Sequence, residues 1–127
     1  MKRLKSQSGF TLIELVIIIL VLGILAATAI PKFYDMTVKA KDAAEKGVVG
    51  GVRGGISIVY ASNLLNNITP AFPATLGGSG TASSTNYFFS NVMSPGIDAD
   101  WTASGAVFTG PAGGAYTYSS TAGTFIK

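Results

Sequence analysis

Residues 10–30 read FTLIELVIIILVLGILAATAI, and this apolar run decides how the chain is built. As a helix it would be about 30 Å long at a rise of 1.5 Å per residue, which is enough to cross the hydrocarbon core of a bilayer. The only charged residue in the run is Glu14, close to its start. A carboxylate inside a membrane-spanning segment costs about 2.5–3.5 kcal/mol on insertion scales, so by default it is a functional group with a partner.

A short basic segment, MKRLKSQSG at residues 1–9, precedes the apolar run, and three interpretations of the two segments stay open. The run would be a plain transmembrane anchor in the first. In the second it would be an ordinary secretory signal, because Ala27-Thr28-Ala29 has the pattern of a cleavage site, although Glu14 and the length of the run argue against this. In the third, residues 1–9 are a leader that is cut before the apolar run.

The composition excludes several kinds of chemistry. The chain has no cysteine and no histidine, so it cannot form a disulfide, a thiolate metal site or a catalytic triad that contains either residue. The net charge of +3 comes from Lys2, Arg3 and Lys5, and the rest of the chain is balanced. We therefore expect no enzyme, no metal, no cofactor and no nucleic-acid binding.

Residues 32–66 are mixed in polarity and are predicted to continue the helix, with Asn66-Asn67 and Pro70 marking its end. Lys41 and Glu45 are expected to form an i,i+4 pair on its polar face. The apolar positions that recur at three- and four-residue steps for much of the way are Val38, Ala44, Val48, Val52, Ile56, Val59 and Tyr60.

Five glycines fall within this second half of the helix: Gly47, Gly50, Gly51, Gly54 and Gly55. Each costs about 1 kcal/mol of helix propensity relative to alanine, so something must offset the loss. The glycines at 47, 51 and 55 form a smooth stripe that lets another backbone approach, and we expect it to face either the chain's own sheet or a neighbouring helix. The alternative is a local break or bend near Gly50.

Residues 67–127 are rich in Gly, Ser, Thr and Ala and contain little charge. Short strands are predicted at 87–89, 106–109, 116–118 and 124–126, and the last two would form a hairpin closed around residues 119–123. An antiparallel sheet packed on the second half of the helix is the expected architecture, so the predicted fold class is α+β. The segments 75–85 and 109–114 are predicted to be exposed loops.

Asp98 and Asp100 lie beside Trp101 but supply too few ligands for a calcium site, so we expect solvated or helix-capping acids in a turn. Trp101 is predicted to be a core residue. The spacing of the five tyrosines, at positions 34, 60, 87, 116 and 118, favours core packing over an electron path.

The sequence Gly9-Phe10-Thr11-Leu12-Ile13-Glu14-Leu15, followed by the apolar run and Pro31, resembles the N-terminus of type IV pilins and of the pilin-like proteins of type II secretion. Residues 30–63 also resemble, less specifically, the helix of mannose-sensitive-haemagglutinin-like pilins. The resemblance implies the pilin fold. Its parts would be a leader peptide over 1–9, a transmembrane or filament-core helix over 10–31, an amphipathic helix half over 32–66 and a small β-rich globular domain over 67–127.

The same resemblance implies roles for individual residues. A prepilin peptidase would cut after Gly9 on the cytoplasmic side, and the new N-terminus, Phe10, would be N-methylated. Glu14 would face the Phe10 amine of its own chain or of a neighbouring subunit, where opposite charges in a low dielectric attract strongly. The alternative is that Glu14 stays protonated or snorkels toward the cytoplasm.

Gly23 and Pro31 enclose the weakest part of the apolar helix. Proline removes the hydrogen bond to the carbonyl of Ala27, and glycine lowers helix propensity. In filaments of the resembled family such a span can lose helical form, and we expect the same here. The alternative is a mild proline kink.

The function expected from the resemblance is that of a structural subunit of a type IV pilus. It would span the inner membrane once, with a cytoplasmic N-terminus, and later join a helical filament at the cell surface. That orientation is taken from the resemblance, because basic residues flank the run on both sides. The alternatives are a type II secretion pseudopilin and a membrane-anchored adhesin that does not polymerise. Expected partners are further copies of the chain, prepilin peptidase, the pilus or type II secretion assembly machinery and membrane lipid.

Overall fold

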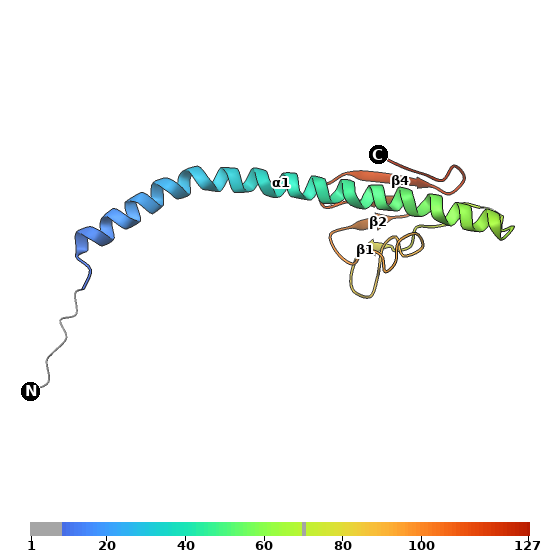
Figure 1. Ribbon diagram of the computed structural model, residues 1–127, viewed down its shortest axis with the longest axis horizontal. Coiled ribbons are helices and arrows are strands. Elements are labelled where there is room, and N and C mark those ends of the chain that lie inside the picture. The colour runs from blue at the N-terminus through green and yellow to red at the C-terminus, as the bar shows by residue number, and fades with distance from the viewer. Residues whose placement is uncertain (1–8, 70) are drawn as a thin grey trace, which may run out of the picture. The chain divides into compact units, whose positions relative to one another are not determined.

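The computed structural model describes residues 9–69 and 71–127, so the leader predicted at 1–9 lies almost entirely outside the described residues. The described part contains one helix and five strands: α1 (Leu12–Leu65), β1 (Gly80–Thr81), β2 (Thr102–Ser104), β3 (Val107–Thr109), β4 (Ala115–Ser119) and β5 (Thr124–Ile126). The chain is therefore α+β, as predicted (Figure 1). It divides into two compact units, one up to Thr37 and one from Val38 to Lys127, and α1 contributes to both.

The helix α1 is continuous over 54 residues and includes Pro31 and all the glycines that the sequence places in it. Its ends lie within two residues of the predicted ones. The alternative of a break near Gly50 is wrong, because the helix runs through this position without interruption. Burial of the later part of α1 against the sheet offsets its low intrinsic propensity, since tertiary packing supplies most of the stability of helices in proteins.

The five strands form one antiparallel sheet in the order β1-β2-β3-β4-β5, so each strand pairs with its neighbour in sequence. Three of the four predicted strands are confirmed as β3, β4 and β5. The predicted hairpin is also confirmed, because Ser119, the last residue of β4, pairs with Thr124, the first residue of β5. The strands β1 and β2 extend the sheet beyond what the sequence pattern predicted.

The predicted strand at 87–89 is wrong. Phe88 forms only an isolated bridge with Ile97, and Phe89 has a positive φ of 60°. Both phenylalanines are fully buried. Neighbouring residues of a strand point to opposite faces of the sheet, so a strand could not place both side chains in the same core. Three consecutive aromatics match the composition of a strand, but the core here requires a loop.

The prediction that 75–85 is an exposed loop is also wrong in part. This segment contains β1, and it buries Leu76 and Ala82. The composition of this segment does not indicate burial, because only two of its side chains are apolar and the rest are glycine, serine and threonine.

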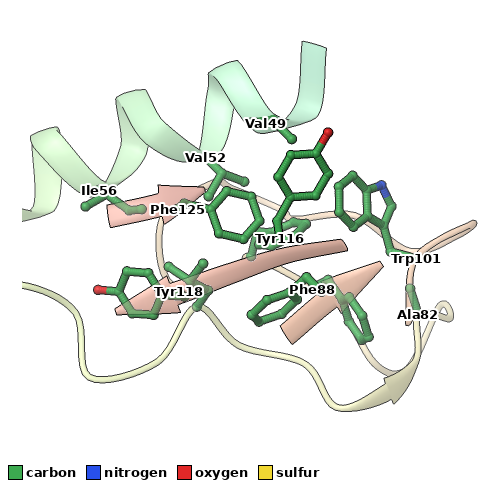
Figure 2. Close-up of a cluster of buried hydrophobic side chains, with 12 residues drawn as sticks. Val49, Val52, Ile56, Ala82, Phe88, Trp101, Tyr116, Tyr118 and Phe125 are labelled. Carbon is green, nitrogen blue, oxygen red and sulfur yellow. The ribbon is translucent and has the colours of Figure 1, made fainter. Parts of the chain in front are cut away.

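One face of the sheet forms the core against α1. Side chains at alternate positions of the strands share that face, since Phe108 is paired with Tyr116 and Tyr118 with Phe125. Figure 2 shows Val49, Val52 and Ile56 pointing from the helix toward Tyr116 and Phe125. The buried cluster comprises Val49, Val52, Ile56, Leu76, Ala82, Phe88, Phe89, Trp101, Phe108, Tyr116, Tyr118 and Phe125. The prediction that Trp101 is a core residue is confirmed.

Both edges of the sheet accept hydrogen bonds from side chains. At the β1 edge, Nδ2 of Asn86 donates to the carbonyls of Ser79 and Thr81, at 2.6 Å and 2.9 Å. At the β5 edge, Nε of Arg53 donates to the carbonyl of Phe125 at 2.9 Å. These contacts occupy backbone acceptors that would otherwise be free to pair with a strand of another molecule.

Candidate assembly site

The N-terminal residues of the proposed processing site are exposed and precede the helix. Gly9 and Phe10 lie outside α1, and 83% of the surface of Phe10 is accessible to solvent. The peptide bond between them is therefore part of an irregular segment that leads into the helix. Cleavage after Gly9 and methylation of Phe10 stay predictions.

Glu14 caps the start of the helix that contains it. Its Oε2 accepts hydrogen bonds from the backbone N–H and from the hydroxyl of Thr11, both at 2.9 Å. In return, Oγ1 of Thr11 accepts a longer hydrogen bond of 3.3 Å from the N–H of Glu14. Together these contacts form a capping box, in which the residue before the helix and the third residue of its first turn satisfy each other's backbone donors. The carboxylate thus points toward the N-terminus of α1, one residue from the backbone nitrogen of Phe10.

The apolar run exposes large hydrophobic side chains all around the helix. Among the described residues, α1 is the one helix that is long and apolar enough to cross a membrane, and none of its most apolar stretch is buried. The exposed apolar side chains of this stretch are Leu12, Ile13, Leu15, Val16, Ile17, Ile18, Ile19, Leu20, Val21, Leu22, Ile24, Leu25 and Ile30. A surface of this kind is unfavourable in water and marks contact with lipid or protein.

Gly23 and Pro31, the predicted weak points, both lie within unbroken α1. The missing side chain of Gly23 leaves a shallow groove on the apolar surface, between Leu20 and Ala27. Pro31 has no N–H to donate to the carbonyl of Ala27, so this turn of the helix lacks one backbone bond. The expectation that the span from Gly23 to Pro31 loses helical form concerns the filament and stays a prediction.

Glu45 occupies a position that the sequence analysis misjudged. It is buried, with 2% of its surface exposed, and it does not pair with Lys41. The surface ion pair of this region is formed instead by Lys46 and Asp42, at 2.6 Å. The predicted Lys41–Glu45 pair is wrong because Glu45 lies on the same helix face as Val49 and Val52, which faces the sheet.

The buried carboxylate of Glu45 holds the loop between β3 and β4. Its Oε2 accepts hydrogen bonds from the N–H groups of Ala112 and Gly114, at 2.9 Å and 3.3 Å. Its Oε1 accepts one from the hydroxyl of Tyr116 at 2.8 Å. This hydrogen bond, together with burial, raises the pKa of Tyr116. Three donors from one hairpin therefore satisfy a carboxylate that would otherwise be costly to bury.

A signal for this site was present in the sequence. Glu45 precedes Val49, Val52 and Ile56 at the spacing of one helix face, so it continues the apolar stripe. A carboxylate in line with buried positions predicts a polar partner in the core. The predicted exposed loop at 109–114 supplies that partner, and its residues Gly110 and Gly114 are buried rather than exposed.

The glycines of the second helix half face two directions. A side chain at Gly55 would collide with the backbone carbonyl of Val92, and one at Gly51 would touch Met93. Side chains at Gly47, Gly50 and Gly54 would meet open space. The stripe predicted at 47, 51 and 55 therefore approaches the chain's own domain at its last two positions.

Asp98 and Asp100 are exposed, in agreement with the expectation of solvated acids. Within residues 9–69 and 71–127, no group of three or more His, Cys, Asp or Glu side chains is arranged to hold a metal ion. Of the five tyrosines, Tyr116 and Tyr118 are core residues, whereas Tyr34 and Tyr87 are exposed. The prediction of core packing therefore holds for two of them, and Tyr60 stacks on Phe72 at 4.4 Å.

The sequence was compared with family models, curated proteins and solved structures. Residues 4–30 match the family model of the prokaryotic N-terminal methylation motif. The fimbrial protein EcpC of Eikenella corrodens is 35% identical over 80 residues, which is 63% of this chain and 48% of that protein. The type IV narrow pilus major component PilA5 of Thermus thermophilus is 46% identical over 50 residues, 39% of this chain and 43% of that protein.

A third relative belongs to another system. The type II secretion system core protein G of Pseudomonas aeruginosa is 32% identical over 74 residues, 58% of this chain and 48% of that protein. The chain spans less than half of the length of each of these relatives. No solved structure matches the chain. The chain is therefore similar to fimbrial and type IV pilus proteins and also to a type II secretion protein.

Proposed function

We propose that this chain is a structural subunit of a type IV pilus, assembled as a helical filament from the inner membrane. The observation that carries the proposal is the apolar run of α1, which is exposed on all sides and whose one charged residue, Glu14, lies within the matched methylation motif. Burial of apolar surface drives association, so this helix requires lipid before assembly and neighbouring subunits afterwards. The helix enters the membrane once, with its N-terminus in the cytoplasm, and the β-rich domain forms the surface of the filament.

Processing by prepilin peptidase prepares the subunit in this proposal. The enzyme cuts the bond between Gly9 and Phe10, which lies outside the helix and is exposed. Cleavage turns the amide nitrogen of Phe10 into a cationic amine, which is then methylated. That amine lies one residue before the backbone N–H that Glu14 already binds.

Glu14 then pairs with the Phe10 amine of its own or a neighbouring subunit. Each charge would be costly alone in an apolar filament core, and each compensates the other. The capping box with Thr11 keeps the carboxylate directed toward the N-terminus while the chain waits in the membrane.

The test of assembly compares two substitutions that each remove one carboxylate from α1. We expect Glu14→Ala to enter the membrane normally but to abolish fibres seen by electron microscopy, whereas Asp35→Ala, at an exposed position, keeps them. Fibres formed by Glu14→Ala in normal numbers would overturn the proposal. That outcome would favour a membrane-anchored adhesin that does not polymerise.

The test of processing is the N-terminal sequence and mass of protein taken from cells. We expect the mature chain to begin at Phe10 with a methylated amine. A chain that begins at Ile30 would indicate an ordinary secretory signal, and an intact Met1 would indicate a plain anchor.

A type II secretion pseudopilin is the second candidate, because core protein G of that system is among the relatives. A pseudopilin builds a short periplasmic fibre, so its deletion would stop protein secretion. Deletion of a pilin would instead remove fibres from the cell surface and leave secretion unchanged.

A further inference from the structure

Trp101, Tyr116 and Glu45 are neighbours, in that order, inside the β-rich domain. The ring centroids of Trp101 and Tyr116 are 6.1 Å apart, and Figure 2 shows the two side chains next to each other. The Tyr116 hydroxyl donates a hydrogen bond of 2.8 Å to Oε1 of Glu45, and at most 7% of the surface of each residue is exposed. We propose that these residues form a one-electron redox site, in which Tyr116 gives an electron to oxidised Trp101 and a proton to Glu45.

The site acts when a one-electron oxidant, such as a radical derived from oxygen, has taken an electron from the indole of Trp101. Tyr116 then transfers one electron to the indole, which returns to its closed-shell state. With that electron, the hydroxyl proton of Tyr116 moves along the hydrogen bond to Oε1 of Glu45. The products are a neutral phenoxyl radical and a neutral carboxylic acid, so the oxidation that began at Trp101 ends at Tyr116.

The buried charge of Glu45 favours this end point. An electron removed from Trp101 leaves a positive charge in the core, where an unpaired charge is costly. Glu45 is the one charged residue among the buried side chains that the structure describes, and opposite charges attract strongly in such an interior. Transfer of the proton to Glu45 removes both charges. The cation of Lys127, 6.0 Å from the centre of the Tyr116 ring, opposes a charged ring but not a neutral radical.

Tyr118 differs from Tyr116 in its hydrogen-bond acceptor and not in its burial. The two side chains lie two residues apart on one face of β4, with 6% of the surface of Tyr118 exposed against 7% for Tyr116. The Tyr118 hydroxyl donates to the backbone carbonyl of Pro73 at 2.6 Å. A carbonyl oxygen accepts a hydrogen bond but does not take up the proton, whereas a carboxylate does both. Oxidation of Tyr118 would therefore leave a positive charge in the core.

Flash photolysis of the full chain in micelles of a neutral detergent tests the site. Trp101 is the one tryptophan of the chain, so light at the red edge of tryptophan absorption ionises it selectively. A cobalt(III) ammine complex in the water takes up the released electron irreversibly. We expect the absorption of the tryptophan radical to decay while that of a phenoxyl radical appears.

Two tyrosine variants locate the electron donor. Tyr116→Phe should lengthen the lifetime of the tryptophan radical about tenfold or more, because a phenylalanine ring has no hydroxyl proton to release. The matched control is Tyr118→Phe, which removes the other buried hydroxyl of β4 and should keep the wild-type lifetime. Circular dichroism establishes which variants are folded.

The role of Glu45 as proton acceptor has two tests. Glu45→Gln keeps an oxygen that accepts a hydrogen bond but removes the base, so the phenoxyl radical should form about tenfold more slowly or not at all. In the wild type the same step should be slower in heavy water than in light water, because the proton moves with the electron. This second measurement applies even if a variant does not fold.

Three outcomes would overturn the proposal. The first is a wild type in which no phenoxyl radical follows the tryptophan radical. The second is a wild-type lifetime of the tryptophan radical in folded Tyr116→Phe. The third is equal rates of phenoxyl formation in light and heavy water. All three are measured on the unassembled chain, so none depends on whether it forms fibres.

Discussion

At the scale of single residues, the buried carboxylate of Glu45 leads to a prediction about the stability of the domain. It is the one charged residue among the buried side chains that the structure describes, and it accepts three hydrogen bonds. Glu45→Ala would leave two buried backbone donors and the Tyr116 hydroxyl without their partner. A buried donor that loses its acceptor costs about 1–3 kcal/mol.

We therefore expect Glu45→Ala to lower the free energy of unfolding by about 1–3 kcal/mol or more, measured by urea denaturation in micelles. Glu45→Gln should lose less, because an amide still offers one oxygen to the loop. The control is Asp42→Ala, which breaks the surface pair with Lys46 and should change stability by about 0.5 kcal/mol at most. Equal losses in Glu45→Ala and Asp42→Ala would contradict the role of Glu45.

The raised pKa of Tyr116 leads to a prediction about how the stability of the domain changes at alkaline pH. Its hydrogen bond to Glu45 and its burial raise its pKa above the ordinary value of 10.0. The unfolded chain therefore releases this proton at a lower pH than the folded chain does. The stabilising contribution is complete below about pH 10 and is lost as the pH rises from there through the raised pKa of the folded state.

We expect Tyr116→Phe to flatten the fall in stability above pH 10, while it lowers stability at neutral pH through the lost hydrogen bond. Tyr87→Phe, at an exposed tyrosine, serves as the control and should keep the wild-type slope. Denaturation curves at a series of pH values measure both slopes. The same slope in Tyr116→Phe and wild type would show that the tyrosine does not titrate in this way.

At the scale of secondary-structure elements, two neighbouring glycines of α1 allow the effect of helix propensity on stability to be measured apart from the effect of tertiary packing. Gly54 has open space where a side chain would be, whereas Gly55 lies against the backbone of Val92. We expect Gly54→Ala to stabilise the folded domain by about 1 kcal/mol, the difference in helix propensity. Gly55→Ala should destabilise it, because the added methyl group collides with a carbonyl that cannot rotate away.

Thermal or urea unfolding of the unassembled chain tests this pair of changes under the same conditions. If Gly54→Ala and Gly55→Ala shift stability in the same direction, the packing of α1 on the 90–93 loop is not as described. If the Gly54→Ala variant is more stable but fails to form fibres, the face of α1 that is open at Gly54 is covered by another subunit in the filament.

The span of α1 between Gly23 and Pro31 leads to a prediction about the assembled fibre. Its backbone has one hydrogen bond fewer at Ala27, so it should open more readily than the turns on either side. We expect amides of this span to exchange hydrogen faster in fibres than their neighbours do, and Pro31→Ala to slow that exchange. Pro111→Ala, in a loop of the other unit, is the control. Uniform protection through the span in wild-type fibres would refute the predicted loss of helix.

At the scale of the whole molecule, the sheet is protected from pairing with other copies at both edges. Asn86 binds the outer carbonyls at β1, and Arg53 binds one at β5. We expect Asn86→Ala and Arg53→Ala to free these acceptors and to increase aggregation on mild heating, measured by light scattering. Thr117→Ala, on the exposed face of the interior strand β4, should aggregate as the wild type does. Unchanged scattering in both edge variants would show that other features protect the sheet.

The sequence alone determined the parts of this protein that depend on local pattern. The apolar run, the extent of α1 within two residues and the three strands β3 to β5 were readable from spacing and composition, whereas the methylation motif was identified by its resemblance to the N-terminus of type IV pilins. Periodicity reports which residues share a face of a helix or strand, and turn residues report where an element ends. Both signals involve residues within a few positions of one another.

Only the tertiary structure decided which of those faces meet. The partners of Glu45 lie 67 to 71 residues later in the chain, Gly55 rather than Gly54 is covered, and Phe88 and Phe89 enter one core from a loop instead of a strand. No local pattern contains these contacts, because they depend on how the sheet closes over one side of the helix. Burial and hydrogen bonding at long range then override the propensity of the individual residues.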